Sequence, residues 1–137
     1  MADFIPDASV SLAWCFADEA TPYSEGLLGR LIAGEEAAVP PHWPLEILNG
    51  VLQGKRRGRV AEPDVQKLFT SLISFHIVLD AEHGFARLDA IRELAERHRL
   101  TSYDGAYLEL AMRLGLPLAT LDGDLRKAAQ AEKVPLI

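Results

Sequence analysis

The stretch TSYDGAYLELAMRLGLPLATLDGDL, residues 101–125, decides which fold the sequence predicts. A polar cap and a helix come first, Gly115 stops the helix, and the short apolar segment 117–121 follows as a strand. Asp104 lies at the start of this helix, and Asp122 comes directly after the strand, where a second helix begins. Carboxylates at the ends of elements in this arrangement are the first indication of a functional site.

Short apolar segments alternate with helices along the rest of the chain as well. Strands are predicted at 3–6, 36–40, 76–79, 117–121 and 134–137. Apolar spacing and helix-start signals predict helices over about 8–17, 22–33, 43–57, 62–73, 83–99, 101–115 and 122–131. Strands separated by helices in this way predict an α/β protein with a mainly parallel sheet and helices on both faces.

The composition predicts one domain that needs no covalent cross-link. The 137 residues suit a single domain, residues 1–137, and the only cysteine, Cys15, excludes an internal disulfide. No segment approaches the roughly 18 consecutive apolar residues of a membrane span. The start of the chain, MADFIPD, has no basic region of the kind that opens a signal peptide. We therefore expect a cytoplasmic protein with no membrane partner.

Two of the acids directly follow predicted strands. Asp7 comes after the segment 3–6, and Asp122 comes after the segment 117–121. In open parallel sheets, ligands bind beyond the carboxyl ends of the strands, so the two carboxylates would point into one crevice if these strands are neighbours. Asp104 begins the helix that leads into the second of these strands, and the local chain alone does not place it in that crevice.

Each of these acids also has a purely structural explanation. Asp7 and Asp122 are suitable N-caps, which contribute about 1 kcal/mol each to helix stability, and Asp124 favours a helix N-terminus. Thr101-x-x-Asp104 matches a capping box, in which both side chains cap the same helix start. Against this explanation, Asp104 shares the inward side of its helix with apolar residues, whereas a capping acid needs only a place at the surface.

A cluster of these carboxylates would need cations. At a separation of ~4 Å and an effective dielectric of ~20, each pair of like charges costs on the order of 4 kcal/mol, so protons or metal ions must intervene. Oxygen ligands favour Mg²⁺ or Mn²⁺, whereas zinc prefers His or Cys. The histidines show no spacing typical of ligands: His42, His76, His83 and His98. Cations held by carboxylates stabilise phosphoryl transfer, which indicates cleavage of phosphodiester bonds.

The net charge of −6 at first argues against a nucleic-acid partner. Most of this charge belongs to the candidate ligands Asp7, Glu46, Asp104, Asp122 and Asp124. If these acids hold divalent cations, the working surface no longer repels phosphate. A basic run that could hold a phosphate backbone, or could simply be a solvated helix end, is formed by Lys55, Arg56, Arg57 and Arg59.

Periodicity does not select Glu46 as a site residue. The predicted helix 43–57 has an apolar side, and Glu46 lies on the other side together with Asn49, Gly50 and Gln53. A solvated helix acid explains this position on the pattern alone. Gly50 beside it would allow another backbone to approach closely.

Two long motifs and two short ones carry a family resemblance. The long motifs are L-T-x-Y-D-x-x-Y-L-x-L-A over 100–111 and L-P-L-A-T-L-D-x-D-L over 116–125. The short ones are D-A-S at 7–9 and the pair Glu46 and Asn49. With these motifs, essentially the whole chain resembles the PIN domain family, and more narrowly the VapC-type toxin ribonucleases of toxin–antitoxin pairs.

The resemblance implies a three-layer α/β/α sandwich around a central, mainly parallel sheet of about five short strands. It implies Mg²⁺- or Mn²⁺-dependent endoribonuclease activity on RNA, a homodimer, and an antitoxin protein that inserts into the active-site groove. The implied catalytic and metal-binding acids are Asp7, Glu46, Asp104 and Asp122, with Asp124 as an optional fifth ligand. Ser9 and Thr120 lie beside the acids and could orient them, as could Asn49. Gly105, where the family more often has alanine, removes no ligand.

Three other classes of protein compete with this interpretation. A response-regulator receiver needs paired acids after its first strand and a lysine before its last helices, and no lysine lies near Pro117. A haloacid-dehalogenase-type phosphatase needs Asp-x-Asp after its first strand, but position 9 is serine. A catalytically silent PIN-fold binding scaffold would have lost one of the acids, and none is lost.

Overall fold

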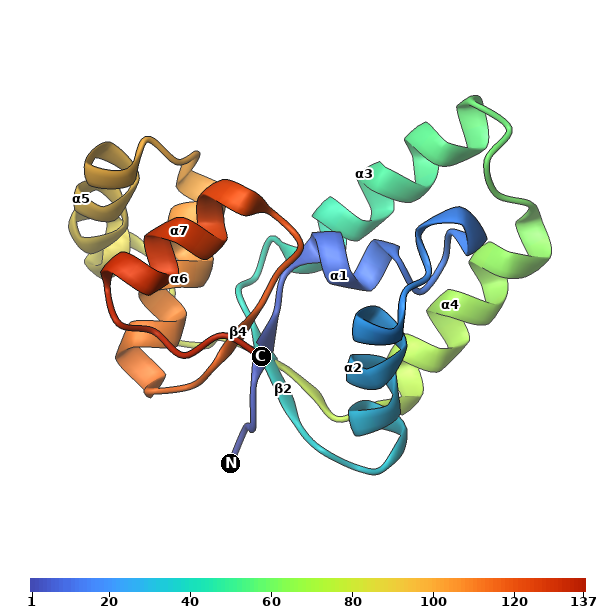
Figure 1. Ribbon diagram of the computed structural model, residues 1–137, viewed down its shortest axis with the longest axis horizontal. Coiled ribbons are helices and arrows are strands. Elements are labelled where there is room, and N and C mark those ends of the chain that lie inside the picture. Colours follow the sequence, from blue (N-terminus) through green and yellow to red (C-terminus); the bar gives the residue numbers. More distant parts are fainter.

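A sheet of short parallel strands crosses the middle of the computed structural model, which describes residues 1–137 (Figure 1). The strands are β1 (Ile5–Pro6), β2 (Ala37–Val39), β3 (Ile77–Leu79) and β4 (Leu118–Ala119). Strand β1 pairs with β4 and β2 pairs with β3, in both cases in parallel. An isolated parallel bridge between Phe4 and Ala37 joins the two pairs, so the strands follow the order β3, β2, β1, β4.

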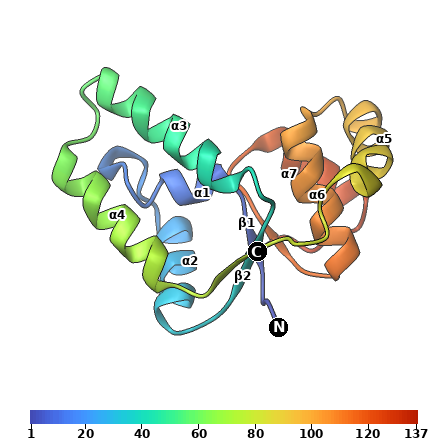
Figure 2. The ribbon, with the colours of Figure 1, turned by 180° about the vertical axis from the view of Figure 1, so that it is seen from behind.

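Helices cover both faces of this sheet. They are α1 (Ala8–Leu12), α2 (Pro22–Ile32), α3 (Trp43–Arg56), α4 (Glu62–Ser74), α5 (Leu88–His98), α6 (Ser102–Leu114) and α7 (Gly123–Ala131). In Figure 1, α1 to α4 lie on one side of the sheet and α5 to α7 on the other, and Figure 2 shows the same division from behind. This arrangement confirms the predicted helices on both faces of the sheet and is the α/β/α sandwich that the family resemblance implies.

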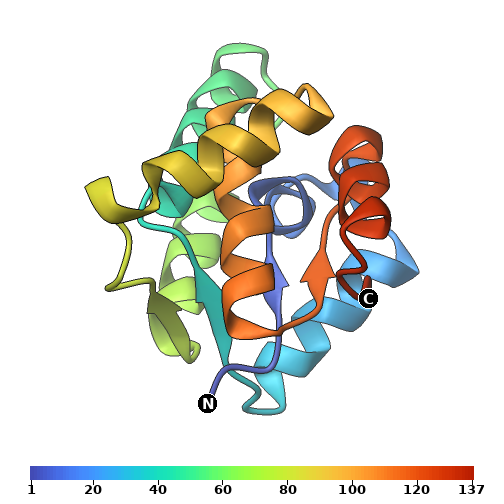
Figure 3. The ribbon, with the colours of Figure 1, turned by 90° about the vertical axis from the view of Figure 1, so that its left-hand side faces the viewer.

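Helix α6 lies directly against the strands and contacts both α5 and α7 (Figure 3). Every residue from Gly105 to Ala111 is buried, because the helix has neighbours around most of its circumference. A Cβ at Gly105 would lie 3.2 Å from the carbonyl oxygen of Ile91, so the missing side chain allows α5 to approach closely. Gly115 ends the helix in a left-handed conformation with φ of 66°, as the sequence predicts.

Two predicted helices are shorter in the structure. The first ends at Leu12, because the amides of Trp14 and Cys15 bond to carbonyls three residues back and turn the chain. The fifth starts at Leu88, after a single 3₁₀ turn, because Gly84 has a φ of 123° that no α-helix contains.

The predicted last strand, 134–137, is wrong. Only Leu136 forms an isolated bridge, to Leu118, because Pro135 has no N–H with which to extend the ladder. The sheet therefore has four strands instead of about five. The carbonyl of Pro135 still accepts a hydrogen bond from the Leu118 amide at 2.9 Å, which keeps this end of the chain beside β4.

Candidate active site

The carboxyl ends of β1 and β4 lie side by side, so the two strands that precede Asp7 and Asp122 are neighbours. Pro6 is in register with Ala119, so the residues that follow, Asp7 and Thr120, leave the sheet together. The amide of Asp7 donates a hydrogen bond to the Ala119 carbonyl at 3.0 Å. The two strand ends therefore form one edge from which side chains can enter a common site.

One cavity of about 330 Å³ lies at this edge. All four acids of the predicted quartet line it, namely Asp7, Glu46, Asp104 and Asp122. The predicted orienting residues Ser9 and Asn49 line it as well. We call it the acid cavity, and no lysine or arginine contributes to its wall.

Asp7 is fixed in the acid cavity by three donors. It is the N-cap of α1, and its Oδ1 accepts hydrogen bonds from the Val10 amide at 3.2 Å and from the Ser9 hydroxyl at 2.5 Å. The Thr120 hydroxyl donates to Oδ2. Burial raises the pKa of Asp7 above its ordinary value, and these three hydrogen bonds act in the opposite direction. The N-cap role of Asp7 is therefore compatible with its place in the wall of the acid cavity.

Asp104 is not used as a helix cap. Its amide donates to the Thr101 hydroxyl at 3.1 Å, but this is only half of the predicted capping box, and the Asp104 carboxylate accepts no hydrogen bond. Burial raises the pKa of Asp104 to about 6, with further contributions from the charges of Asp122, Asp7 and Glu46. The carboxylate thus lies unpartnered among three other acids.

Asp122 and Asp124 differ in their surroundings. Asp122 is the N-cap of α7, where its Oδ2 accepts from the Leu125 amide at 2.8 Å, and its own amide donates to the Thr120 hydroxyl at 3.0 Å. Asp124 lies in the exposed first turn of α7 and does not line the acid cavity. Thr120 thereby links the two strand-end acids, because it bonds to Asp7 as well.

Glu46 enters the acid cavity from the first turn of α3. The Tyr107 hydroxyl donates to its Oε1 at 2.7 Å, and Nε2 of His42 lies 3.2 Å from the same oxygen. The sequence predicted neither of these partners. The place of Tyr107 three residues after Asp104, on the same face of α6, was the available signal.

Gly50 allows a close approach, although of a different kind from the one expected. A Cβ at Gly50 would lie 2.4 Å from Cδ1 of Leu12, so the neighbour is a side chain of α1 and not another backbone. The contact holds α1 against α3 beside the acid cavity, which both Gly50 and Leu12 line.

The basic run lies at the far end of α3, away from α6 and α7 (Figure 1). Lys55 pairs with Glu62 at 2.5 Å, and Arg59 pairs with Asp18 and Glu19 at 3.0 and 2.9 Å. Arg56 and Arg57 are exposed and form no ion pair within the chain. None of the four basic residues lines the acid cavity.

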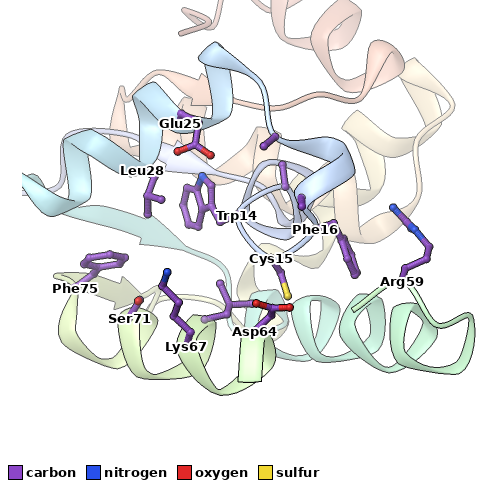
Figure 4. Close-up of a pocket in the computed structure, with 14 residues that line it drawn as sticks. Trp14, Cys15, Phe16, Glu25, Leu28, Arg59, Asp64, Lys67, Ser71 and Phe75 are labelled. Atoms are coloured by element: carbon purple, nitrogen blue, oxygen red, sulfur yellow. The ribbon is translucent and has the colours of Figure 1, made fainter. Parts of the chain in front are cut away.

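A larger cavity of about 460 Å³ lies between α4 and the part of the chain that runs from the end of α1 into α2 (Figure 4). Its wall is mostly hydrophobic, with Trp14, Leu28 and Phe75 among the lining residues. Burial raises the pKa of the Cys15 thiol, and the charge of Asp64 raises it further, so this thiol is not activated. The groups suited to acid–base or metal chemistry therefore lie in the acid cavity and not in the larger one.

The donor set of the acid cavity fits a hard divalent cation. Its acids offer only oxygen ligands, and no lysine or arginine lines the cavity to offset their charge. The Asp104 carboxylate and Oε2 of Glu46 accept no hydrogen bond from the protein, so both are available to a cation. In the conformation of the structure, no three His, Cys, Asp or Glu side chains are close enough together to hold a metal ion. A cation would therefore have to draw the carboxylates inward.

A model of the PIN domain matches residues 4–131 of the sequence. This chain belongs to the PIN domain family. The match excludes the receiver and phosphatase folds, which were alternatives on the sequence alone. It covers every acid of the cavity. None of the helices of this PIN domain combines the length and hydropathy of a membrane span.

Two known ribonucleases are similar to this chain. The ribonuclease VapC3 of Pyrobaculum aerophilum is 35% identical over 94 residues, which cover 67% of this chain and 66% of VapC3, just under two thirds. The ribonuclease VapC12 of Mycobacterium tuberculosis is 27% identical over 101 residues, which cover 74% of this chain and 75% of VapC12.

Two solved structures share the fold. PAE2754 from Pyrobaculum aerophilum has a TM-score of 0.70 at 25% identity, over 93% of this chain and 79% of that one. VapC20 from Mycobacterium tuberculosis, a toxin that cleaves the sarcin–ricin loop, has a TM-score of 0.65 at 17% identity, over 92% and 95% of the two chains. The likeness to VapC20 bears on the fold alone.

Proposed function

We propose that this PIN domain is a divalent-metal-dependent endoribonuclease and the toxin of a toxin–antitoxin pair. The observation that carries the proposal is that four acids, which come from the starts of α1, α3, α6 and α7, line one cavity at the strand ends. The similarity to VapC3 and VapC12, both ribonucleases by name, supports RNA as the substrate.

The ligands would be Asp7, Glu46, Asp104 and Asp122, which suit Mg²⁺ or Mn²⁺. When bound, such a cation neutralises charge at the scissile phosphate and increases the acidity of a coordinated water. Ser9 and Thr120 hold the Asp7 carboxylate in place through their hydroxyls. Asp104 accepts no hydrogen bond and has a pKa of about 6, so a cation has to displace a proton from it in mildly acidic solution.

Asp124 and Asn49 have subordinate roles in this proposal. Asp124 lies outside the acid cavity in the first turn of α7, and it would tune or complete a second metal site from beside the four acids. Asn49 lies one turn after Glu46 on α3 and lines the cavity, where its amide can orient Glu46 or contact the RNA.

The partners follow from the same proposal. RNA would run across the acid cavity. Of the basic run, Arg56 and Arg57 are free to contact its backbone, since Lys55 and Arg59 are engaged in ion pairs. An antitoxin protein would block the cavity, and the toxin would act as a homodimer in the cytoplasm.

The test is cleavage of a mixed RNA pool by the purified protein, in Mg²⁺ or Mn²⁺ and then in chelator. The comparison is with Asp7→Asn, which keeps a residue equally suited to an N-cap while it removes the charge. Asp64→Asn is the matched control, because it removes one exposed acid from the wall of the larger cavity. We expect cleavage by the wild type and by Asp64→Asn, loss with chelator, and none by Asp7→Asn.

This experiment distinguishes the nuclease from the alternative, a catalytically silent PIN scaffold. A scaffold that binds partners without cutting would leave the RNA pool intact in every arm, although the protein is folded and free of antitoxin. Equal cleavage by wild type and Asp7→Asn would contradict the role of the acid cavity and would point to a contaminating nuclease.

A further inference from the structure

Glu46 differs from the other acids of the cavity in how it is held. Asp7 and Asp122 are fixed by N-cap hydrogen bonds to their own helices. The Glu46 side chain makes no hydrogen bond to its own helix and is 31% exposed. Ordering a glutamate side chain costs up to about 2 kcal/mol of conformational entropy, so a ligand at this position needs an external support.

Tyr107 provides a support that is packed in the core. The residue is fully buried in the main hydrophobic core, at 0% exposure, on the interior helix α6. Its hydroxyl donates to Oε1 of Glu46 at 2.7 Å, across 61 positions of sequence. We propose that Tyr107 is a positioning residue, whose hydroxyl fixes one oxygen of Glu46 so that the other stays available to a divalent cation.

The arrangement of contacts on the two oxygens supports this assignment. Both neighbours, the Tyr107 hydroxyl and Nε2 of His42, approach Oε1. Oε2 accepts no hydrogen bond from the protein. A purely structural tyrosine–glutamate bond would not require the second oxygen to remain free at the edge of a cavity that three other acids line. Orienting partners of this kind typically change metal affinity 10- to 100-fold when they are removed.

Helix α6 consequently acts on the acid cavity in two ways. It contributes Asp104 directly, and one turn later it contributes the hydroxyl that orients Glu46 on α3. The inference rests on the proposed function only in that Glu46 is taken as a metal ligand.

The experiment measures Mn²⁺ affinity by calorimetry, without RNA, for the wild type, Tyr107→Phe, Glu46→Gln and the double variant. Tyr107→Phe removes only the hydroxyl oxygen. We expect it to weaken Mn²⁺ binding about 10-fold, and we expect the double variant to bind no more weakly than Glu46→Gln, because the hydroxyl acts through the carboxylate. Tyr103→Phe is the control, since that ring also contacts His42 but its exposed hydroxyl bonds to nothing.

Each outcome decides the question. Unchanged Mn²⁺ affinity in Tyr107→Phe would overturn the proposal. A loss of affinity in the double variant equal to the sum of the losses in the two single variants would overturn it as well. A weaker affinity that comes with a lowered unfolding temperature in chelator would indicate a role in folding instead. If the expected coupling is found but the wild type cuts no RNA, the positioning role stands and the proposed nuclease activity fails.

Discussion

The electrostatics of single residues set the properties of the acid cavity, and Asp104 is the clearest case. Its carboxylate lacks a hydrogen-bond donor, and burial together with three neighbouring acids raises its pKa to about 6. At neutral pH, the ionised carboxylate is therefore less stable in the folded protein than in the unfolded chain. Such a cost is expected where a binding site is arranged for a ligand rather than for stability.

Asp104→Asn should abolish cleavage and still give a folded protein. In chelator at pH 7 we expect it to be more stable than the wild type by about 1 kcal/mol, after allowance for solvent screening of a half-buried carboxylate. RNA cleavage assays and urea denaturation measure the two effects. Loss of activity through unfolding would instead favour a capping role, although only the Thr101 half of the capping box is present.

The stability difference between these two proteins should depend on pH. Because the pKa of Asp104 is raised from 3.8 to about 6, the folded state binds more protons than the unfolded state between these values. Stability is thus lost as pH rises through this window. In chelator, the wild type should equal Asp104→Asn near pH 4 and fall below it by pH 7. Denaturation at four pH values tests this, and a constant difference would contradict it.

At the scale of elements, helix α3 is shaped by glycines that admit neighbouring side chains. A Cβ at Gly54 would lie 2.4 Å from Cε1 of Phe16, whose ring is 3% exposed and faces the Arg59 guanidinium at 4.6 Å. Gly50 admits Leu12 in the same way. The two contacts seat the chain around α1 against α3, and this seating brings Asp7 and Glu46 to the same cavity.

Gly54→Ala should therefore destabilise the protein, although alanine is the better helix former. Overpacking of a core ring costs about 1–3 kcal/mol, against a gain of roughly 0.5–1 kcal/mol from helix propensity, so we expect a net loss of about 1 kcal/mol. Gly26→Ala in α2 is the control, because a Cβ there meets nothing within 4 Å, and it should stabilise by about 0.5–1 kcal/mol. The midpoints of urea denaturation compare the stabilities of the two variants with that of the wild type. Equal stabilisation by both would mean that Phe16 moves aside freely.

At the scale of the whole molecule, the sequence predicted the layers of helices and sheet better than the contacts between side chains that are distant in sequence. Asp7 and Asp122 could be predicted to lie close together, because Asp7 directly follows β1, Asp122 comes soon after the end of β4, and ligands bind beyond the carboxyl ends of parallel strands. Glu46 could not be predicted from periodicity, since a helical wheel places it on the polar side. Its bond to Tyr107 joins distant parts of the chain, and only the family motif connected Glu46 with the other acids.

The net charge of the molecule leads to the last prediction, which concerns stability without RNA. Charge at the acid cavity opposes folding in the absence of cations, so Mn²⁺ or Mg²⁺ should raise the unfolding temperature at pH 7. At 100 times its Kd a cation that binds only the folded state adds about 2.7 kcal/mol. The gain should shrink at pH 5, where protons compete at Asp104. Asp122→Asn should remove most of it.

The control for this measurement is NaCl at matched ionic strength, which screens repulsion without ligating carboxylates. A rise in the unfolding temperature with Mn²⁺ that NaCl does not reproduce, and that Asp122→Asn lacks, would mean that the cation binds at the acid cavity. An equal shift with NaCl would mean that general screening of a chain with a net charge of −6 explains the effect. In that case the four carboxylates would be acids that the fold brings together without a metal, and the proposal of a metal-dependent nuclease would lose its physical basis.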